Sequence, residues 1–324
     1  MTRTLAVVAL AAALAACAPS EPPVRWAIAI HGGAGTISRE LSEAERREYE
    51  QALASALAAG RDVLAAGGSA LDAVERVVIQ MEDDPHFNAG RGAVLTWDGG
   101  HELDAAIMDG STLACGAVAG VTTVRHPIAL ARGVMERTEH VFLAGEGAER
   151  LAGELALERV DNDWFTTPRR LAAWEALRAG PPSAAPGGGT VGAVALDAAG
   201  RLAAASSTGG TLGKRRGRIG DTPVIGAGTY ADGTCAVSAT GRGEEFLRRG
   251  VARAIALEAE IGRSSCAEAA ERIVREVLAE GDGGVVVVGR DGRIGMPFNT
   301  PGMYRGAADA RGRFEVAIWD DGAR

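Results

Sequence analysis

The sequence predicts an α+β fold of four layers, in which two stacked, mainly antiparallel sheets lie between outer helices. Helices alternate with short strands through residues 26–179, whereas consecutive strands dominate after residue 190. Consecutive hairpins are typical of antiparallel sheets and argue against a parallel, doubly wound sheet. The 45 glycines and the many short apolar runs also indicate numerous strands and tight turns.

Length and composition favour one large globular domain over residues 25–324. The chain has 324 residues, of which 47% are hydrophobic and 23% charged, so a sizeable core is expected. The formal net charge of −8 disfavours nucleic acid and anionic membranes as partners. We find no fixed-period repeat and no second domain boundary.

The first 17 residues have the features of an export signal. An apolar run over 5–14 is too short to span a bilayer and is followed by small residues. The ending Leu14–Cys17 resembles a bacterial lipobox, which makes Cys17 the expected lipidation site and residues 18–24 a tether. The alternative is an ordinary secretory signal cut beside Cys17. Both interpretations predict an exported protein, either periplasmic or anchored to the outer membrane by its lipid.

Elements of the first half are predicted in order from their periodicity. A strand over 26–30 precedes a helical pattern over 40–66. Ser69 begins a second helix, with Asp72 placed as in a capping box. After a compact loop at 82–92, we expect strands over 93–97, 102–108 and 116–121, and helices over 127–136, 145–156 and 168–179.

Residues 180–189 interrupt the pattern, because they are rich in proline and glycine and lack an apolar period. Strands over 190–196 and 201–207 then flank a turn at 197–200. The remaining predictions are strands over 223–229 and 235–240, helices over 243–261 and 265–279, and strands over 285–288, 294–297 and 314–319. Three cysteines in the predicted domain match no metal spacing, and we expect buried thiols rather than a disulfide framework: Cys115, Cys235 and Cys266.

Thr190 follows three glycines and begins a predicted strand. A threonine hydroxyl is a poor nucleophile unless a base removes its proton. A free N-terminal threonine carries such a base, its α-amine, with a pKa of about 7.7–8.0. This chemistry requires cleavage between Gly189 and Thr190, into an α-subunit ending at 189 and a β-subunit of 190–324. From composition alone, a flexible linker before a strand is the simpler interpretation.

Six ordered segments favour the chemical interpretation. They are IAIHGGAGTI (28–37), FNAGRGAVLTWDGGHELDAAIMDG (87–110), GAVAGV (116–121), the stretch 187–231, ATGRGEEFLR (239–248) and MPFNTPGMYRG (296–306). Together they resemble the plant-type asparaginase/isoaspartyl peptidase family of N-terminal nucleophile hydrolases. The resemblance runs from about Trp26 to Trp319 and implies the fold of that class and a dimer of αβ heterodimers.

The resemblance implies a catalytic group. Thr190 matches the nucleophile, and Thr208 matches the threonine that orients it. Thr240 and Gly241 match an oxyanion hole, in which one hydroxyl and one backbone N–H face the developing negative oxygen. Asn88 matches an asparagine beside the nucleophile.

It also implies a binding site for the head of an L-amino acid. Arg218 matches the group that grips the α-carboxylate, for which a planar fork is suited. Asp221 and the carbonyl of Gly243 match partners of the α-ammonium, with Gly241 nearby. Taken singly, Arg218 could be a solvated charge and Asp221 a turn residue. Together they predict hydrolysis of a β-linked amide, in β-aspartyl dipeptides or asparagine.

The loop at 81–91 matches one that binds a structural sodium ion through backbone carbonyls, and no other cofactor is expected. The implied ligands are Met81, Glu82, Asp84, Phe87, Ala89 and Arg91. The alternative is a well-turned loop with no ion. The HGGAG motif at 31–35 lacks a P-loop lysine and is expected to pack beside the active site.

Some features depart from the family pattern and leave alternatives open. Arg242 lies where a small or uncharged residue is common, and the linker before Thr190 is short. One alternative is a glycosylasparaginase, and another is a lipid-anchored protein that binds aspartate-like ligands without turnover. A serine-triad hydrolase is disfavoured because no G-x-S-x-G elbow is present.

Overall fold

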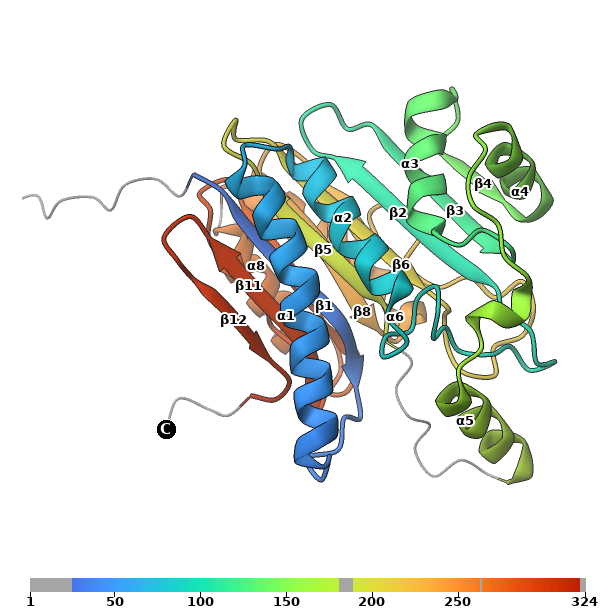
Figure 1. Ribbon diagram of the computed structural model, residues 1–324. Coiled ribbons are helices and arrows are strands. Elements are labelled where there is room, and N and C mark those ends of the chain that lie inside the picture. The colour runs from blue at the N-terminus through green and yellow to red at the C-terminus, as the bar shows by residue number, and fades with distance from the viewer. Residues whose placement is uncertain (1–24, 181–188, 263, 321–324) are drawn as a thin grey trace, which may run out of the picture.

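Two sheets stack face to face between outer helices in the computed structural model, which describes residues 25–180, 189–262 and 264–320 (Figure 1). The larger sheet contains, in spatial order, β12 (Phe314–Ala317), β11 (Gly302–Asp309), β1 (Ala27–Gly35), β5 (Val191–Leu196), β6 (Leu202–Thr208), β2 (Leu103–Asp109), β3 (Cys115–Val121) and β4 (Phe142–Ala144). The smaller contains β10 (Ile294–Gly295), β9 (Gly283–Gly289), β8 (Cys235–Gly241) and β7 (Thr229–Ala231). Among these strands only the β3–β4 pair is parallel. The predicted four-layer fold is confirmed.

Helices α1 (Glu43–Ala65), α2 (Ala70–Asp83) and α3 (Pro127–Arg137) cover the outer face of the larger sheet (Figure 1). Local signals explain where they begin. Ser42 and Glu45 form a capping box at α1, and the side chain of Ser69 accepts a hydrogen bond from Asp72 N at α2. Their buried faces include Leu53 and Leu57, and each such leucine stabilises the fold by about 1.5–3 kcal/mol.

On the other side, α6 (Gly243–Arg249), α7 (Val251–Glu260) and α8 (Cys266–Arg272) cover the smaller sheet. The single helix predicted over 243–261 is divided because Gly250 adopts a left-handed conformation, with φ of 56°. The helix predicted over 265–279 continues past α8 only as a short π-helix, Ile273–Val277. At the edge of the molecule lie α4 (Gly145–Glu154), the 3₁₀ turn Asn162–Phe165 and α5 (Pro168–Ala179).

The layer between the sheets is made mostly of small apolar side chains. Strand β5 is buried at every position, because one face meets α2 and the other meets the smaller sheet. A strand buried on both faces is a continuous apolar run rather than an alternating one, and this is the pattern of VGAVAL. Because β5 packs against the smaller sheet, Thr190 at its start lies between the two sheets.

Several strand predictions are wrong in detail. Residues 93–97 form no strand and have only an isolated bridge between Thr96 and Lys214. Residues 223–228 form turns, so β7 begins at Thr229. Strand β11 was not predicted, because its sequence GMYRGAAD neither alternates nor forms an apolar run.

The prediction of buried thiols is wrong for two of the three cysteines. Cys235 at the start of β8 and Cys266 at the start of α8 form a disulfide across 31 residues of sequence. Both lie in the apolar core under α7 and α8, where the sheet and the helix meet. Cys115 is a free thiol.

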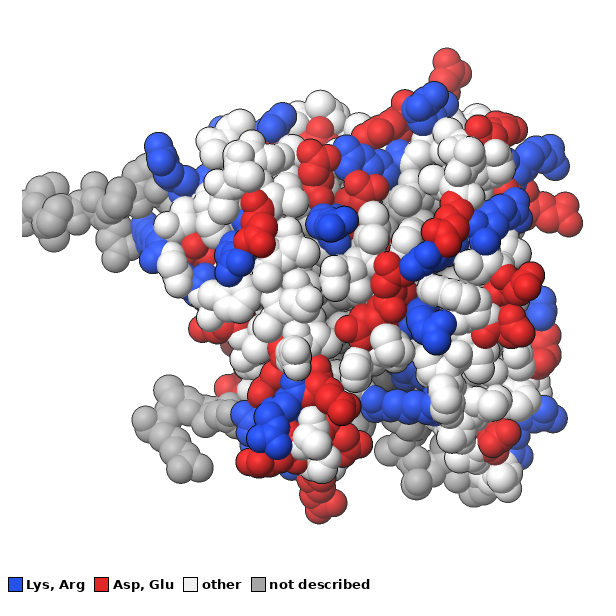
Figure 2. Space-filling view, in the orientation of Figure 1, with Lys and Arg blue, Asp and Glu red and all other residues white. Residues whose placement is uncertain are grey.

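The export signal at 1–17, the tether at 18–24 and most of the break before Thr190 lie outside the described residues. Among the helices described, none combines the length and apolarity needed to cross a bilayer. On the face shown in Figure 2, basic and acidic side chains are interspersed, and neither sign gathers into one patch.

Candidate active site

Thr190 heads β5 at the end of the sheet where β6 and β8 also finish. It is buried, with 7% of its surface exposed. The β5–β6 register pairs Val191 with Ser207, which puts Thr208 level with Thr190 on the neighbouring strand. From the second sheet, the hydroxyl oxygen of Thr240 accepts a hydrogen bond from Thr190 N at 3.1 Å.

The hydroxyl of Thr240 is set up to donate a hydrogen bond. Its oxygen accepts N–H bonds from both Thr190 and Ala34, each at 3.1 Å. With both lone pairs engaged, the hydroxyl hydrogen is left for a further acceptor. Gly241 follows with φ of 148°, and a Cβ there would lie 2.0 Å from the carbonyl oxygen of Asp282. Only glycine fits at this position, the last of β8, where it follows Thr240 directly.

The hydroxyl of Thr190 is 3.1 Å from the hydroxyl of Thr222, a residue that was not predicted to belong to the site. The hydroxyl of Thr208 accepts a hydrogen bond from Gly210 N instead, at 2.9 Å. The described residues thus include three threonines around Thr190: Thr208 is level with it on β6, Thr240 accepts from its N–H, and Thr222 contacts its hydroxyl.

The HGGAG motif packs against the cleavage site, as predicted. His31 is fully buried, and its Nδ1 lies 2.9 Å from the carbonyl oxygen of Thr190. Burial lowers the pKa of His31 to about 3, so its ring is neutral. A Cβ on Gly33 would lie 2.7 Å from Gly189 Cα, so the two backbones touch and leave no room for a side chain.

Arg218, Asp221 and Gly243 come together as the sequence predicts. A Cβ on Gly243 would lie 2.7 Å from Asp221 Oδ1 and 3.1 Å from Arg218 Nη2. The side chain of Asp221 is buried, and its Oδ2 has no hydrogen-bond partner among the described residues. Burial raises the pKa of Asp221 to about 7. A buried carboxylate with an unused oxygen is well suited to a cationic ligand.

Glu244 holds Arg218 in a bidentate ion pair, which sequence reasoning did not predict. The Nε and Nη2 atoms of Arg218 donate to the two carboxylate oxygens of Glu244, at 3.0 and 2.9 Å. The ion pair lowers the pKa of Glu244 and leaves Nη1 of Arg218 for another acceptor. The fork is thus oriented before any ligand arrives.

Asn88 and Lys214 support the loop after Thr208. Asn88 donates to the carbonyl of Gly210 at 2.7 Å and accepts from Val94 N at 2.8 Å. Lys214, the single lysine, is buried and donates to the carbonyl of Glu102 at 2.8 Å. Both residues therefore hold the loop after Thr208 in place.

The loop predicted to hold sodium is closed by its own backbone hydrogen bonds. The carbonyls of Met81, Asp84 and Glu82 accept from Asp84, Phe87 and Arg91, the last at 2.7 Å. Each of these carbonyl oxygens retains a second lone pair. Within the described residues, no cluster of histidine, cysteine or carboxylate side chains could hold a metal ion.

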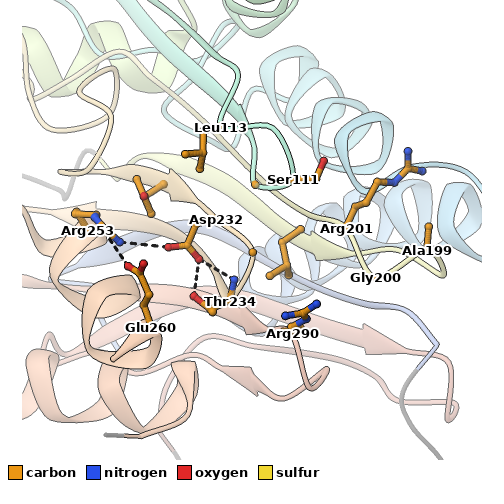
Figure 3. Close-up of a pocket in the computed structure, with 14 residues that line it drawn as sticks. Ser111, Leu113, Ala199, Gly200, Arg201, Asp232, Thr234, Arg253, Glu260 and Arg290 are labelled. Atoms are coloured by element: carbon orange, nitrogen blue, oxygen red, sulfur yellow. Dashed lines mark hydrogen bonds and ion pairs between the residues drawn. The ribbon is translucent and has the colours of Figure 1, made fainter. Parts of the chain in front are cut away.

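A cavity of about 630 Å³ lies at the opposite end of β5 and β6, away from Thr190 (Figure 3). Arg253 bridges Asp232 and Glu260 on its wall, at 3.3 and 2.9 Å. Because it is lined by the turn at 199–202, at the far end of β5 and β6 from Thr190, the cavity is separate from the candidate site.

The four-layer architecture with a threonine at the head of a central strand is that of the N-terminal nucleophile hydrolases. The chain belongs to the asparaginase family, whose model matches residues 24–318. It is 49% identical over 292 residues to the isoaspartyl peptidase of Salmonella typhimurium, covering 86% of this chain and 93% of the relative. It is 40% identical over 323 residues to the probable isoaspartyl peptidase/L-asparaginase 2 of Arabidopsis thaliana, covering 91% and 99%.

Proposed function

We propose that this protein is an isoaspartyl peptidase and L-asparaginase that activates itself by cleaving between Gly189 and Thr190. The observation that carries the proposal is the juxtaposition of Thr190 with Thr240, at 3.1 Å from N to Oγ1, at the head of a buried strand. The relatives named isoaspartyl peptidase, at 48–49% identity over most of the chain, support the same activity.

Self-cleavage would begin with attack of the Thr190 hydroxyl oxygen on the carbonyl carbon of Gly189. The C–N bond breaks as the C–O bond forms, which leaves an ester on the threonine and a free α-amine. Water then hydrolyses the ester to give the Gly189 carboxylate. The close approach of Gly33 to Gly189 supports this step, because it fixes the backbone that is attacked.

In the mature enzyme the freed amine of Thr190 takes the proton from its own hydroxyl. The hydroxyl oxygen attacks the side-chain amide carbon of the substrate, and the Thr240 hydroxyl and Gly241 N–H stabilise the oxyanion. The amine leaves with a proton, and water releases the aspartyl group from the ester. No metal is needed in these steps.

The head of the substrate would bind between Arg218 and Asp221. In this proposal Nη1 of Arg218, which the ion pair with Glu244 leaves unused, binds the α-carboxylate, and the buried carboxylate of Asp221 binds the α-ammonium. This arrangement selects an L-amino acid with a free amine and carboxylate, and it leaves the β-amide over Thr190. Asn88 and Thr208 support the nucleophile from the neighbouring loop and strand.

Three further proposals concern the whole protein. A sodium ion bound by carbonyls of 81–91 would stiffen the loop that carries Asn88. Export, with lipidation at Cys17 as its form, is supported by the disulfide between Cys235 and Cys266, because disulfides persist in oxidising compartments. The assembly is a dimer of αβ heterodimers.

The function is tested by assaying the purified protein against three substrates: β-aspartyl-leucine, L-asparagine and N4-glycosylated asparagine. We expect hydrolysis of the first two and little of the third. Preference for the glycosylated substrate would replace the proposal with a glycosylasparaginase. A processed protein that binds aspartate tightly and turns over none of the three would indicate the binding protein.

A further inference from the structure

Six buried hydrogen bonds, linked at Thr222 through that residue's own covalent bonds, join the carbonyl of Thr190 to its own hydroxyl. The steps are Thr190 O to His31 Nδ1 (2.9 Å), His31 Nε2 to Ser238 Oγ (2.7 Å), Ser238 Oγ to Ser206 Oγ (2.8 Å), Ser206 Oγ to Thr229 Oγ1 (2.7 Å), Thr229 Oγ1 to the Thr222 carbonyl (3.0 Å), and Thr222 Oγ1 to Thr190 Oγ1 (3.1 Å). We call these five partner residues the polar ring.

The polar ring crosses from one sheet to the other. His31 and Ser206 lie on β1 and β6 of the larger sheet, and Ser238 and Thr229 lie on β8 and β7 of the smaller one. All four are fully buried, in a layer otherwise filled by small apolar side chains. Burying hydroxyls there costs free energy unless each is hydrogen-bonded, so packing alone does not account for them.

The positions of the hydrogens follow from counting donors. The neutral ring of His31 has one N–H, and the carbonyl of Thr190 can only accept. The N–H is therefore on Nδ1, and Nε2 must accept from Ser238. Because the single hydrogen of Ser238 is used there, Ser206 donates to Ser238. The single hydrogen of Thr229 is shared between two acceptors.

Gly192 leaves the space in which His31 contacts Ser238. A Cβ on Gly192 would lie 1.9 Å from Ser238 Oγ and 2.5 Å from His31 Nε2. Gly192 is two residues after Thr190 and pairs with His31 across β1 and β5. The bare backbone at 192 is what allows the imidazole of one sheet to meet the hydroxyl of the other.

We propose that the polar ring is a positioning device that fixes the rotamer of the Thr190 nucleophile, with Thr222 as the residue in direct contact. This inference rests on the proposed function and deepens it. The ring holds Thr190 at two points, its carbonyl through His31 and its hydroxyl through Thr222. As the hydroxyl loses its proton to the terminal amine, Thr222 donates to the developing alkoxide.

The test compares Ser206→Ala with Ser207→Ala. Both serines are fully buried on β6, but Ser207 faces the helices and donates to the Glu82 carboxyl at 2.6 Å. Each variant loses one buried hydroxyl, so a merely structural effect is similar for both. At position 222 the matched pair is Thr222→Val, which loses the hydroxyl, and Thr222→Ser, which retains it.

Hydrolysis of β-aspartyl-leucine is measured with kcat expressed per cleaved chain, and cleavage is read separately by mass. We expect kcat to fall about 10-fold in Ser206→Ala and about 10–100-fold in Thr222→Val, with KM changed less than about 3-fold. Thr222→Ser and Ser207→Ala should retain kcat within about 2-fold. Equal kcat in Ser206→Ala and Ser207→Ala, or equal loss in both variants at 222, would overturn the proposal.

A second measurement does not depend on activity. The ¹⁵N chemical shifts of His31 in the wild-type protein should report a neutral ring protonated at Nδ1 from neutral pH down to pH 5, and Ser238→Ala should shift the Nε2 resonance. An Nε2–H tautomer would contradict the ring even if the enzyme is active. An inactive, uncut wild-type protein with the expected tautomer would contradict the proposed function while leaving the ring itself observed.

Discussion

Asp221 combines burial with a carboxylate oxygen that no described residue satisfies. Such a group destabilises the folded protein when it is charged, and a cationic ligand that pairs with it offsets this destabilisation. The candidate site therefore carries a measurable conflict between stability and binding.

The conflict predicts a pH-dependent gain in stability for Asp221→Asn. The pKa of Asp221 is raised to about 7 in the folded chain, so ionisation costs stability above the unfolded pKa and the full cost is reached above pH 7. At pH 8.5 we expect the free energy of unfolding of the variant to exceed that of the wild type by up to ~4 kcal/mol, which is the free energy that corresponds to this shift in pKa. The variant should therefore also have the higher melting temperature. The difference should shrink between pH 7 and pH 4, and thermal unfolding across that range measures it. A constant difference would show that Asp221 does not titrate in this range.

The same carboxyl predicts a pH dependence of catalysis. Only ionised Asp221 can pair with the substrate ammonium, so the ratio of kcat/KM in wild type to that in Asp221→Asn should rise with pH through about 7 and then level. The titration of the Thr190 amine is common to both proteins and cancels in the ratio. At pH 8 the ratio should be about 10–100, the loss of one charge-assisted hydrogen bond. A ratio that is independent of pH from 5.5 to 8.5 would exclude Asp221 as the ammonium partner.

At this scale, the family resemblance predicted two pairs of site residues, and the structure places Thr190 beside Thr240 and Arg218 beside Asp221. The sequence analysis did not find the partners that hold them. Thr222 reaches Thr190 across 32 residues of sequence, and Glu244 reaches Arg218 across 26. Such contacts depend on how strands and turns are stacked, which no local pattern encodes.

Among the elements, the close approach of β1 to the cleavage site gives the next prediction. Gly33 has φ of 115°, and a Cβ there would lie 2.7 Å from Gly189 Cα. Gly33→Ala should therefore displace the scissile bond and slow self-cleavage by at least about 10-fold. Gly67→Ala is the control, because Gly67 also has a positive φ, of 83°, but nothing lies within 4 Å of its Cβ. Gel densitometry over time measures the cut fraction, and equal rates in both variants would count against the geometry.

The disulfide between β8 and α8 predicts a specific loss of stability. Cys235→Ser with Cys266→Ser removes a link that spans 31 residues and should cost ~2–4 kcal/mol in unfolding free energy. Cys115→Ser is the matched control and should change stability little, since Cys115 is only partly buried. Denaturant unfolding with and without reductant compares the three proteins. If reductant left the wild-type midpoint unchanged, the disulfide would be absent in solution.

Helices were predicted better than strands because their signals are local. Ser69 caps α2 as predicted, and Pro168 begins α5 at the predicted residue. Strand β11 was missed because GMYRGAAD shows neither alternation nor an apolar run, and residues 93–97 were assigned wrongly because a short buried apolar run also occurs outside a sheet. The disulfide was missed because the spacing of the cysteines does not show that α8 packs on the smaller sheet and brings Cys266 next to Cys235.

For the whole molecule, the stacking of two sheets explains why the site lies where it does. The larger sheet supplies Thr190 and His31, and the smaller sheet supplies Thr240 at the end of β8. Neither sheet alone contains both the nucleophile and the oxyanion donor. The four-layer order could be predicted from the order of helices and strands along the chain. The strand register that places Thr240 of β8 beside Thr190 could not.

The central claim is that the amine of Thr190 acts as the base, and activity must therefore appear together with cleavage. The decisive measurement is intact mass during maturation, taken alongside hydrolysis of β-aspartyl-leucine, for the wild type and for Thr190→Ala. We predict that the rate rises in proportion to a fragment that begins at Thr190 and ends at Arg324, and that the alanine variant stays whole and inactive. Turnover by a chain in which residues 189 and 190 are still linked would contradict this account.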